Sequence, residues 1–178
     1  MSGLRLLRDL ARNNAWSNLR IHQACAALSD DAMKQQRVSF FPTLLSTLAH
    51  ILIVDWYYVD GLEGVGRGRS VFAREIPYET LPPTTEAQRA VDARLIAFCD
   101  ALPDEAALDR MVALDRRDGP HHDRVADVLM HLFVHQIHHR GQVHAMLSGT
   151  EVKPPQLDEF FLADERPIAM RELQDARR

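Results

Sequence analysis

Four histidines lie within nine residues of this chain, at positions 131, 135, 138 and 139. Imidazole is the commonest protein ligand for metal ions at neutral pH. On a helix, residues four positions apart lie one above the other on the same face, close enough to share one ion. The surrounding residues 125–147 repeat their apolar side chains with a helical period. The spacing therefore predicts a helix on which two of the four rings bind one metal ion.

The phase of this helix indicates which two rings face the protein interior. Six apolar residues define the stripe that we expect to face the core: Val125, Leu129, Leu132, Val143, Met146 and Leu147. At about 100° per residue, His139 falls in the middle of this stripe and His135 lies about 40° to one side. His131 and His138 lie further round, towards the polar flank, where we expect solvated side chains. The inward pair is therefore His135 and His139.

A metal held by protein side chains needs at least a third ligand, and a catalytic site keeps a further position open for water. The best candidate is His50, in residues 43–58, a segment that is apolar almost all round and is typical of a helix buried in a bundle. Its only polar stripe consists of Thr43, Ser46, Thr47, His50 and Tyr57. For each histidine on its own, the alternative is an interior ring that hydrogen-bonds within the core and binds no metal.

Two asparagines four positions apart, Asn14 and Asn18, share the apolar stripe of the first helical segment. Buried amides need partners, because an unpaired buried polar group costs about 1–3 kcal/mol. These side chains either bond to a neighbouring helix or line the same polar pocket as His50, and the sequence favours neither. We hypothesise that Asn14, Asn18, Tyr57 and Gln142 surround the metal ligands, since metal-bound histidines usually hydrogen-bond through their other ring nitrogen.

Four long segments have helical periodicity, and they span residues 4–28, 41–60, 85–101 and 121–148. Pro42 lies in the first turn of the second helix, where proline is tolerated, and Gly61 is its expected stop. Thr85 and Gln88 form an expected capping box at the start of the third. Gly149 closes the fourth.

The connections between these segments are uneven in length. Residues 61–83 hold four of the eight glycines and three of the nine prolines. A connection this long is unusual in an up-down bundle, and one that ran the length of the bundle would leave the flanking helices parallel. We expect a short helix near residues 105–112 and a turn at residues 118–120 that starts the fourth helix. No segment shows the alternation typical of a strand.

The composition bounds the class of protein. At 178 residues the chain fits one domain, residues 1–178, and its 46% apolar and 26% charged residues are ordinary for a globular protein. A net charge of −4 without a basic block argues against direct nucleic-acid binding. The two cysteines, Cys25 and Cys99, suit a reducing cytoplasm. Charged residues interrupt every long apolar run, so we expect no signal peptide, no membrane span and a cytoplasmic location.

Three separated motifs, in this order, resemble the DinB family within the wider DinB/YfiT-like superfamily of metal-binding bundles. They are NAWSN at 14–18, LAHILIVD at 48–55 and HQIHHRGQ at 135–142, and PPQLD at 154–158 resembles the family's closing segment. The likeness covers most of the chain. It implies an all-α four-helix bundle with up-down-down-up topology and a long crossover between the second and third helices. The family name refers to induction by DNA damage in a founding member and establishes no chemistry on DNA.

The resemblance also implies a cofactor and a partner. Family members hold a divalent metal, most often zinc or nickel, with one histidine of the second helix and two of the fourth, which here are His50, His135 and His139. They commonly form homodimers. Relatives in the superfamily transfer low-molecular-weight thiols or isomerise maleylpyruvate with mycothiol.

Three neutral imidazoles would leave a divalent ion its full charge, so that bound water would ionise near pH 7 or a thiol would bind as thiolate. We therefore expect a metal-dependent enzyme acting on a small molecule, of the hydrolase or thiol S-transferase type. The alternative is a non-catalytic metal-binding structural or stress-response protein, which a fourth protein ligand would favour. The sequence offers no obvious fourth ligand, because Asp55 lies about 140° from His50 on its helix.

Apolar residues outside the core stripes predict a two-fold homodimer. Trp16, Leu45, Val134 and Ile137 leave surface that a monomer would not cover. Gly141 lies on the side of its helix away from the metal face, although glycine costs about 0.8–1.0 kcal/mol relative to alanine there. We expect it to permit close approach of another backbone, from a loop of the same chain or from a second subunit.

Overall fold

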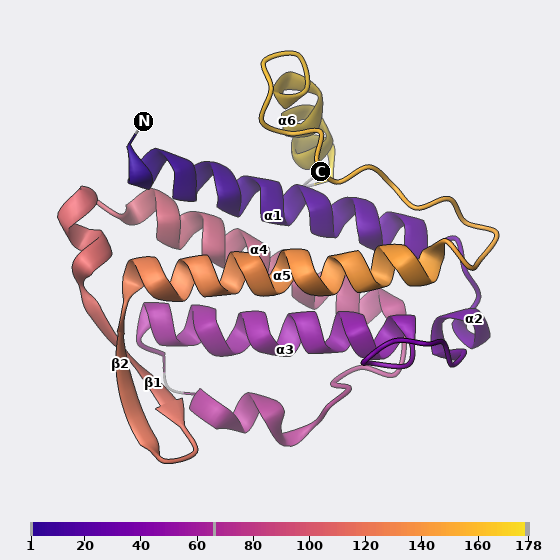
Figure 1. Cartoon of the computed structure of the whole chain (residues 1–178), viewed down its shortest axis with the longest axis horizontal. Helices are drawn as coiled ribbons and strands as arrows, with labels where there is room; N and C mark the ends of the chain where they lie inside the picture. The colour runs from indigo at the N-terminus through magenta and orange to yellow at the C-terminus, as the bar shows by residue number, and fades with distance from the viewer. Residues whose placement is uncertain (1, 66, 177–178) are drawn as a thin grey trace.

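Four long helices lie side by side in the computed structural model, which describes residues 2–65 and 67–176 (Figure 1). They are α1 (Gly3–Cys25), α3 (Leu44–Glu63), α4 (Leu81–Ala101) and α5 (Val125–Leu147). The contacts run from α1 to α4, α4 to α3, α3 to α5 and α5 back to α1, which closes the bundle. Helices α3 and α4 run parallel to each other and antiparallel to α1 and α5 (Figure 1). The bundle therefore has the expected up-down-down-up topology.

The parallel pair is possible because the connection between α3 and α4 runs back along the bundle. It contains the 3-10 helix η1 (Gly68–Ala73) and returns the chain to the end at which α3 began (Figure 1). Shorter elements complete the chain: α2 (Asp30–Lys34), η2 (Glu105–Asp109) and α6 (Arg166–Asp175). Both α2 and α6 were missed by the sequence pattern.

The bounds of α3 correct two expectations. The helix begins at Leu44 and not at residue 41, so Pro42 precedes the helix and does not lie in its first turn. Thr43 caps its start by accepting a hydrogen bond from the Ser46 backbone N–H at 2.9 Å. Its end lies at Gly64, whose φ of 72° is in the left-handed region that favours glycine, and not at Gly61. Gly61 lies inside the helix, where a Cβ atom would stand 2.4 Å from Leu114 Cδ2. Its lack of a side chain lets the segment that carries Leu114 pack directly on α3.

The expected capping box at the start of α4 is wrong. The helix begins at Leu81, and Pro82 and Pro83 occupy its first turn, where a missing N–H leaves no hydrogen bond unmade. Thr85 lies inside the helix, and its Oγ1 is 2.8 Å from His22 Nδ1 on α1. Its hydroxyl therefore joins two helices and caps neither.

The short helix expected near residues 105–112 is present as η2 (Glu105–Asp109), but an antiparallel hairpin follows it and replaces the first turn expected for α5. Strands β1 (Met111–Arg116) and β2 (Gly119–Arg124) pair along their whole length, and Gly119 has a φ of 118° at the turn. Val112 and Leu114 are buried, whereas their neighbours on β1 face outward. The hairpin was missed because residues 111–114 are all apolar and residues 119–124 carry no large apolar side chain, so neither strand alternates in sequence.

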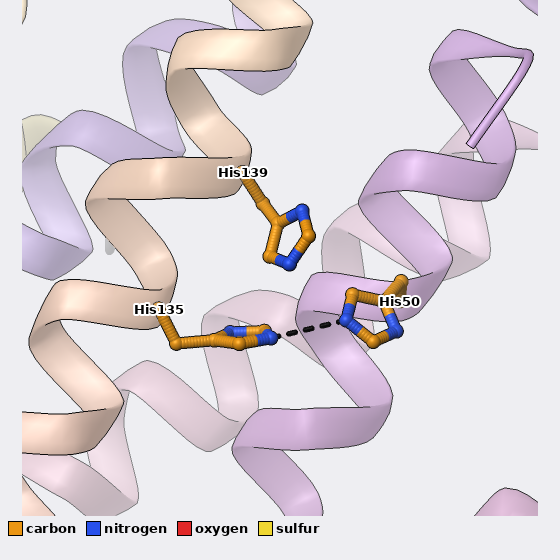
Figure 2. Close-up of side chains that lie close together, drawn as sticks. All are labelled: His50, His135 and His139. Atoms are coloured by element: carbon orange, nitrogen blue, oxygen red, sulfur yellow. Dashed lines mark hydrogen bonds between the residues drawn. The ribbon is translucent and has the colours of Figure 1, made fainter. Parts of the chain in front are cut away.

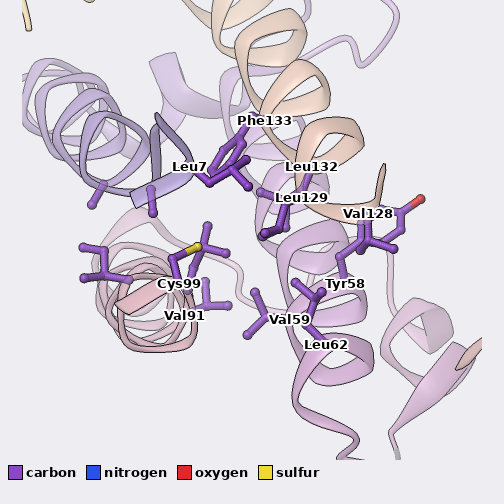
Figure 3. Close-up of a cluster of buried hydrophobic side chains, with 14 of the residues drawn as sticks. Leu7, Tyr58, Val59, Leu62, Val91, Cys99, Val128, Leu129, Leu132 and Phe133 are labelled. Carbon is purple, nitrogen blue, oxygen red and sulfur yellow. The ribbon is translucent and has the colours of Figure 1, made fainter. Parts of the chain in front are cut away.

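The apolar core has two parts with a polar layer between them. The larger cluster includes Leu7, Val59, Val91 and Leu129 (Figure 3), and the smaller one lies towards the other end of the bundle. On α5 the larger cluster ends at Phe133 and the smaller begins at Val143. The intervening turns carry the histidines and several other buried polar side chains. No helix in residues 2–65 and 67–176 is long and apolar enough to span a membrane.

The C-terminal segment covers surface that we expected to remain exposed. Trp16 is fully buried, its ring packs against Phe160 with centroids 5.7 Å apart, and its Nε1 donates to Glu172 of α6 at 2.8 Å. Leu45 is also buried, in the smaller cluster. These two residues therefore leave no apolar surface for a partner. Val134 and Ile137 remain exposed, at 60% and 57%.

Candidate metal centre

Three histidines from two helices converge at the polar layer (Figure 2). His50 comes from α3, and His135 and His139 come from successive turns of α5. One ring nitrogen from each lies within 4.8 Å of the others, and the Nε2 atoms of His50 and His135 are 3.0 Å apart. Around a tetrahedral zinc ion, ligand nitrogens are about 3.3 Å apart. The three residues can thus hold one metal ion, and in the described part of the chain no further histidine, cysteine or carboxylate joins the group.

A hydrogen bond to Gln142 fixes the orientation of His139. Its Nδ1 lies 2.8 Å from the Gln142 side-chain oxygen. That oxygen can only accept, so the Nδ1 atom carries the proton and the lone pair is on Nε2, the nitrogen available to a metal. The Gln142 amide nitrogen lies 3.2 Å from Nε2 of the exposed His138. Gln142 therefore contacts a candidate ligand directly.

The segment before α3 supplies a cover for the rings that the sequence did not indicate. Phe41 stacks on His50, with ring centroids 4.2 Å apart and an interplanar angle of 30°, and lies 5.7 Å from His139. Because Phe41 precedes its helix, no helical phase relates it to the histidines. The adjacent pair Phe40-Phe41 was the only signal that could have suggested an aromatic cover.

Burial keeps the candidate ligands neutral. Desolvation lowers the pKa of His50 to about 4 and that of His135 to about 3, and repulsion from the neighbouring rings adds to both shifts. The pKa of His139 is also lowered, mainly by burial. At neutral pH all three rings therefore carry the free lone pair that metal coordination requires. A donor set of three imidazoles suits zinc and nickel.

The remaining histidines divide between the surface and the core. His131 is exposed beside Tyr58, with ring centroids 5.1 Å apart, and His138 is exposed as expected. His22, which gave no sequence signal, is only 4% exposed, and burial lowers its pKa to about 4. It is a core histidine whose Nδ1 bonds to Thr85, and it belongs to no metal-ligating group in the described part of the chain.

Asn14 and Asn18 join a buried network that links α1, α4 and α5. Their amide nitrogens donate to the Asp92 carboxylate at 3.2 and 3.0 Å. Their amide oxygens both accept from Nη1 of Arg140, which is 4% exposed. These contacts are the interhelical bonds that the sequence left open as the alternative to a pocket role. Each amide thus lies between a buried carboxylate and a buried guanidinium.

Two carboxylates share Arg140, the one buried Lys or Arg side chain in the described part of the chain. Gln88 donates to Asp55 at 2.7 Å and to Asp92 at 3.2 Å, which extends the network to α3. Burial raises the pKa of both carboxyl groups, and repulsion from Asp55 raises that of Asp92 further. The positive charge of Arg140 opposes these shifts. The guanidinium therefore stabilises all four helices through one network.

Tyr57 bonds to the hairpin. Its hydroxyl donates to the backbone oxygen of Asp115 in β1 at 2.7 Å, which ties the hairpin to α3. Its ring lines a cavity that also reaches His135. The four residues that we hypothesised around the metal ligands thus lie in three different places. Gln142 contacts a candidate ligand, Tyr57 lines the cavity, and Asn14 and Asn18 belong to the interhelical network.

Comparisons with known proteins identify the family and support the fold. The model of the DinB family matches residues 1–172. A crystal structure of a DinB-like protein from Bacillus cereus is similar in fold, with a TM-score of 0.61 and 18% sequence identity, over 79% of this chain and 90% of that one. No curated protein matches the chain in sequence.

The buried network gives a prediction about stability. Replacing Arg140 with Met should lower the free energy of unfolding by about 3–5 kcal/mol, because buried carboxylates lose their only cation. The loss relative to wild type should shrink as the pH falls, since protonated Asp55 and Asp92 leave no negative charge to balance. Urea denaturation at several pH values measures both effects.

Arg124→Met is the matched control, because Arg124 directly precedes the same helix but its side chain is 51% exposed beside Asp127. A surface pair of this kind contributes about 0–1 kcal/mol. Equal losses in the two variants would contradict the role assigned to Arg140.

Proposed function

The chain belongs to the DinB family, and we propose that it is a metal-dependent enzyme that acts on a small molecule. His50, His135 and His139 bind one divalent ion, zinc or nickel, which activates a water molecule or a thiol. The observation that carries the proposal is the convergence of three neutral imidazoles without a fourth protein ligand in the described group. Such a set leaves a coordination position for a reactant.

The ion, when bound, lowers the pKa of coordinated water to about 7 or holds a thiol as thiolate. The chain's own residues prepare the position. Gln142 holds the His139 tautomer that presents Nε2, and Phe41 covers one face of His50. The Arg140 network fixes the rotation of α5 from which both of its histidines project. The supported reaction classes are hydrolysis and thiol S-transfer.

We further propose a cytoplasmic protein that does not bind nucleic acid directly. Both cysteines are buried and unpaired, and burial raises the pKa of each thiol to about 12, so neither suits a disulfide or a nucleophile. The net charge of −4 gives no electrostatic support for binding a phosphate backbone.

The metal assignment predicts different outcomes for two neighbouring histidines. His139→Ala should lose bound zinc, because it removes one of three ligands, whereas His138→Ala should keep close to one ion per chain. Elemental analysis measures this in protein made without a histidine tag, since an affinity column can supply nickel. Equal losses in both variants would show that the helix phase is wrong.

Turnover should follow the metal. Assays of thiol transfer and of amide and ester hydrolysis should show activity in wild type and His138→Ala but none in His139→Ala. Zinc binding without turnover of any substrate in the panel would favour the alternative, a metal-binding structural or stress-response protein.

Metal affinity should depend little on pH near neutrality. At a solvated histidine with a pKa of 6.5, protons compete with the metal for the ring nitrogen from that pH downward, whereas His50 and His135 stay neutral until the pH approaches about 4. We therefore expect the zinc affinity of the folded protein to be nearly constant from pH 7.5 to about 5.5 and to fall below about pH 5. Competition with a chromophoric chelator measures it. A steep loss centred near pH 6.5 would contradict the assignment.

We propose that the protein forms a homodimer through an apolar stripe on α5. Met130, Val134 and Ile137 are 46%, 60% and 57% exposed and lie on one face of the helix. Gly141 continues this face, and a Cβ atom added to it would meet no described atom of the chain within 4 Å. No other segment of the described chain therefore needs the space that Gly141 leaves, and we propose that the backbone of a second subunit approaches there.

Ile137→Glu should convert the dimer to a monomer, because the interface would bury an unpaired charge. Ile168→Glu, on α6, is the matched control with a residue of the same type that is 51% exposed. Sedimentation equilibrium at tens of micromolar measures the mass. A wild-type mass that stays near 20.2 kDa at all concentrations would exclude the dimer.

A further inference from the structure

We infer that the cavity beside His135 binds a small organic anion, a carboxylate or phosphate ester with a flat apolar body. The inference rests on the proposed function, because it assigns a substrate class to the same site. The cavity has a volume of about 410 Å³ and lies between α3, α5, η1 and the hairpin. Small-molecule sites commonly have volumes of about 300–1,000 Å³.

Three arginines give this cavity its charge. Arg69 comes from η1, and Arg116 and Arg117 come from the end of β1 and the turn of the hairpin. Within residues 2–65 and 67–176, the guanidinium groups of Arg69 and Arg117 have no ion pair or hydrogen bond. Arg116 approaches Asp123 only at 3.8 Å. Arg116 also hydrogen-bonds to Tyr58, so Arg69 and Arg117 are the two groups that are available to a ligand.

One carboxylate lies among these cations and does not neutralise them. Asp115 lines the same cavity, and its Oδ2 accepts a hydrogen bond from the backbone N–H of Arg69 at 3.2 Å. Three guanidinium groups against Asp115, and against Asp123 beside Arg116, leave a net positive charge of about one, before any metal is bound. Guanidinium forks match the two oxygens of a carboxylate or phosphate, so the ligand expected here is an oxyanion.

The walls of the cavity are aromatic. Tyr57 and Phe72 face each other with ring centroids 5.3 Å apart, and Tyr58 lines the same space. The Arg116 guanidinium lies 5.9 Å from the ring centroids of both tyrosines. Such rings favour a flat, apolar ligand body beneath the cationic groups.

His135 joins this cavity to the candidate metal centre. It lines the cavity and also belongs to the three-histidine group. Its Nδ1 is buried and has no hydrogen-bond partner in the described part of the chain. An anion held by Arg69 and Arg117 would extend its body towards His135. The arginines would thus position the substrate, and the histidine group would supply the reacting centre.

Ligand-observed NMR titrations of zinc-loaded protein test the substrate class with benzoate, phenyl phosphate and benzamide. We expect either anion to bind about tenfold or more tightly than the neutral amide, because only the anions form charge-assisted hydrogen bonds. The tighter of the two anions identifies the headgroup. Equal binding of all three probes, or no binding of either anion, would overturn the inference.

A double variant, Arg69→Gln with Arg117→Gln, locates the binding site. It should weaken binding of the preferred anion by about ten- to a hundredfold, the effect of losing charged hydrogen bonds. Arg74→Gln is the matched control, because Arg74 directly follows η1, is exposed and does not line the cavity. Unchanged binding in the double variant, with far-UV circular dichroism showing a folded protein, would place the anion elsewhere and refute the inference.

Repeating the titration after removal of zinc separates the two proposals. Anion binding that persists in the metal-free protein, together with the loss in the double variant, supports the arginine site even if the chain proves to bind no metal. A protein that binds zinc through its three histidines but shows no preference for anions would keep the proposed function and lose this inference.

Discussion

The rotation of α5 in the bundle depends on one buried cation, the guanidinium of Arg140. An unpaired buried charge is costly, so α5 must present Arg140 to the amide oxygens of Asn14 and Asn18. His139 is the adjacent residue, about 100° away around the helix, and this angle turns it towards α3. The hydrogen bonds of Arg140 on one face of α5 thereby set the direction of His135 and His139 on the neighbouring face of the same helix.

The Arg140 network contains buried charged groups of both signs, whereas the histidine group contains only neutral rings. No carboxylate belongs to the group, so nothing in it compensates a proton on His50 or His135, and burial lowers their pKa values. Neutral rings leave lone pairs facing one another, and the bond between these two Nε2 atoms satisfies only one of them. A divalent cation would satisfy all three at once. The arrangement is therefore costly as a hydrogen-bonded cluster and favourable as a ligand set.

Sequence periodicity predicted which side chains share a face of the same helix. The phase of α5 alone separates His135 and His139 from His138, because a helix repeats its faces regularly. Periodicity could not assign the partners of Asn14 and Asn18, since Asp92 is more than seventy residues away and lies on a helix whose apolar face gives no sign of it. It also misplaced Thr85, whose hydroxyl bonds to another helix and not to its own backbone. Partners across the bundle depend on tertiary packing, which no local pattern contains.

The irregular segments have a separate role from the helices. The candidate metal ligands lie on α3 and α5, which the core and the Arg140 network hold in place. The three arginines of the neighbouring cavity lie on η1 and the hairpin, which contact the bundle from outside through residues such as Tyr57 and Gly61. Loops on a rigid scaffold can change side chains with little effect on the core. The same fold can therefore keep one metal-binding arrangement and accept different substrates, so the residues of η1 and the hairpin, and not the histidines, would determine which small molecule this protein binds.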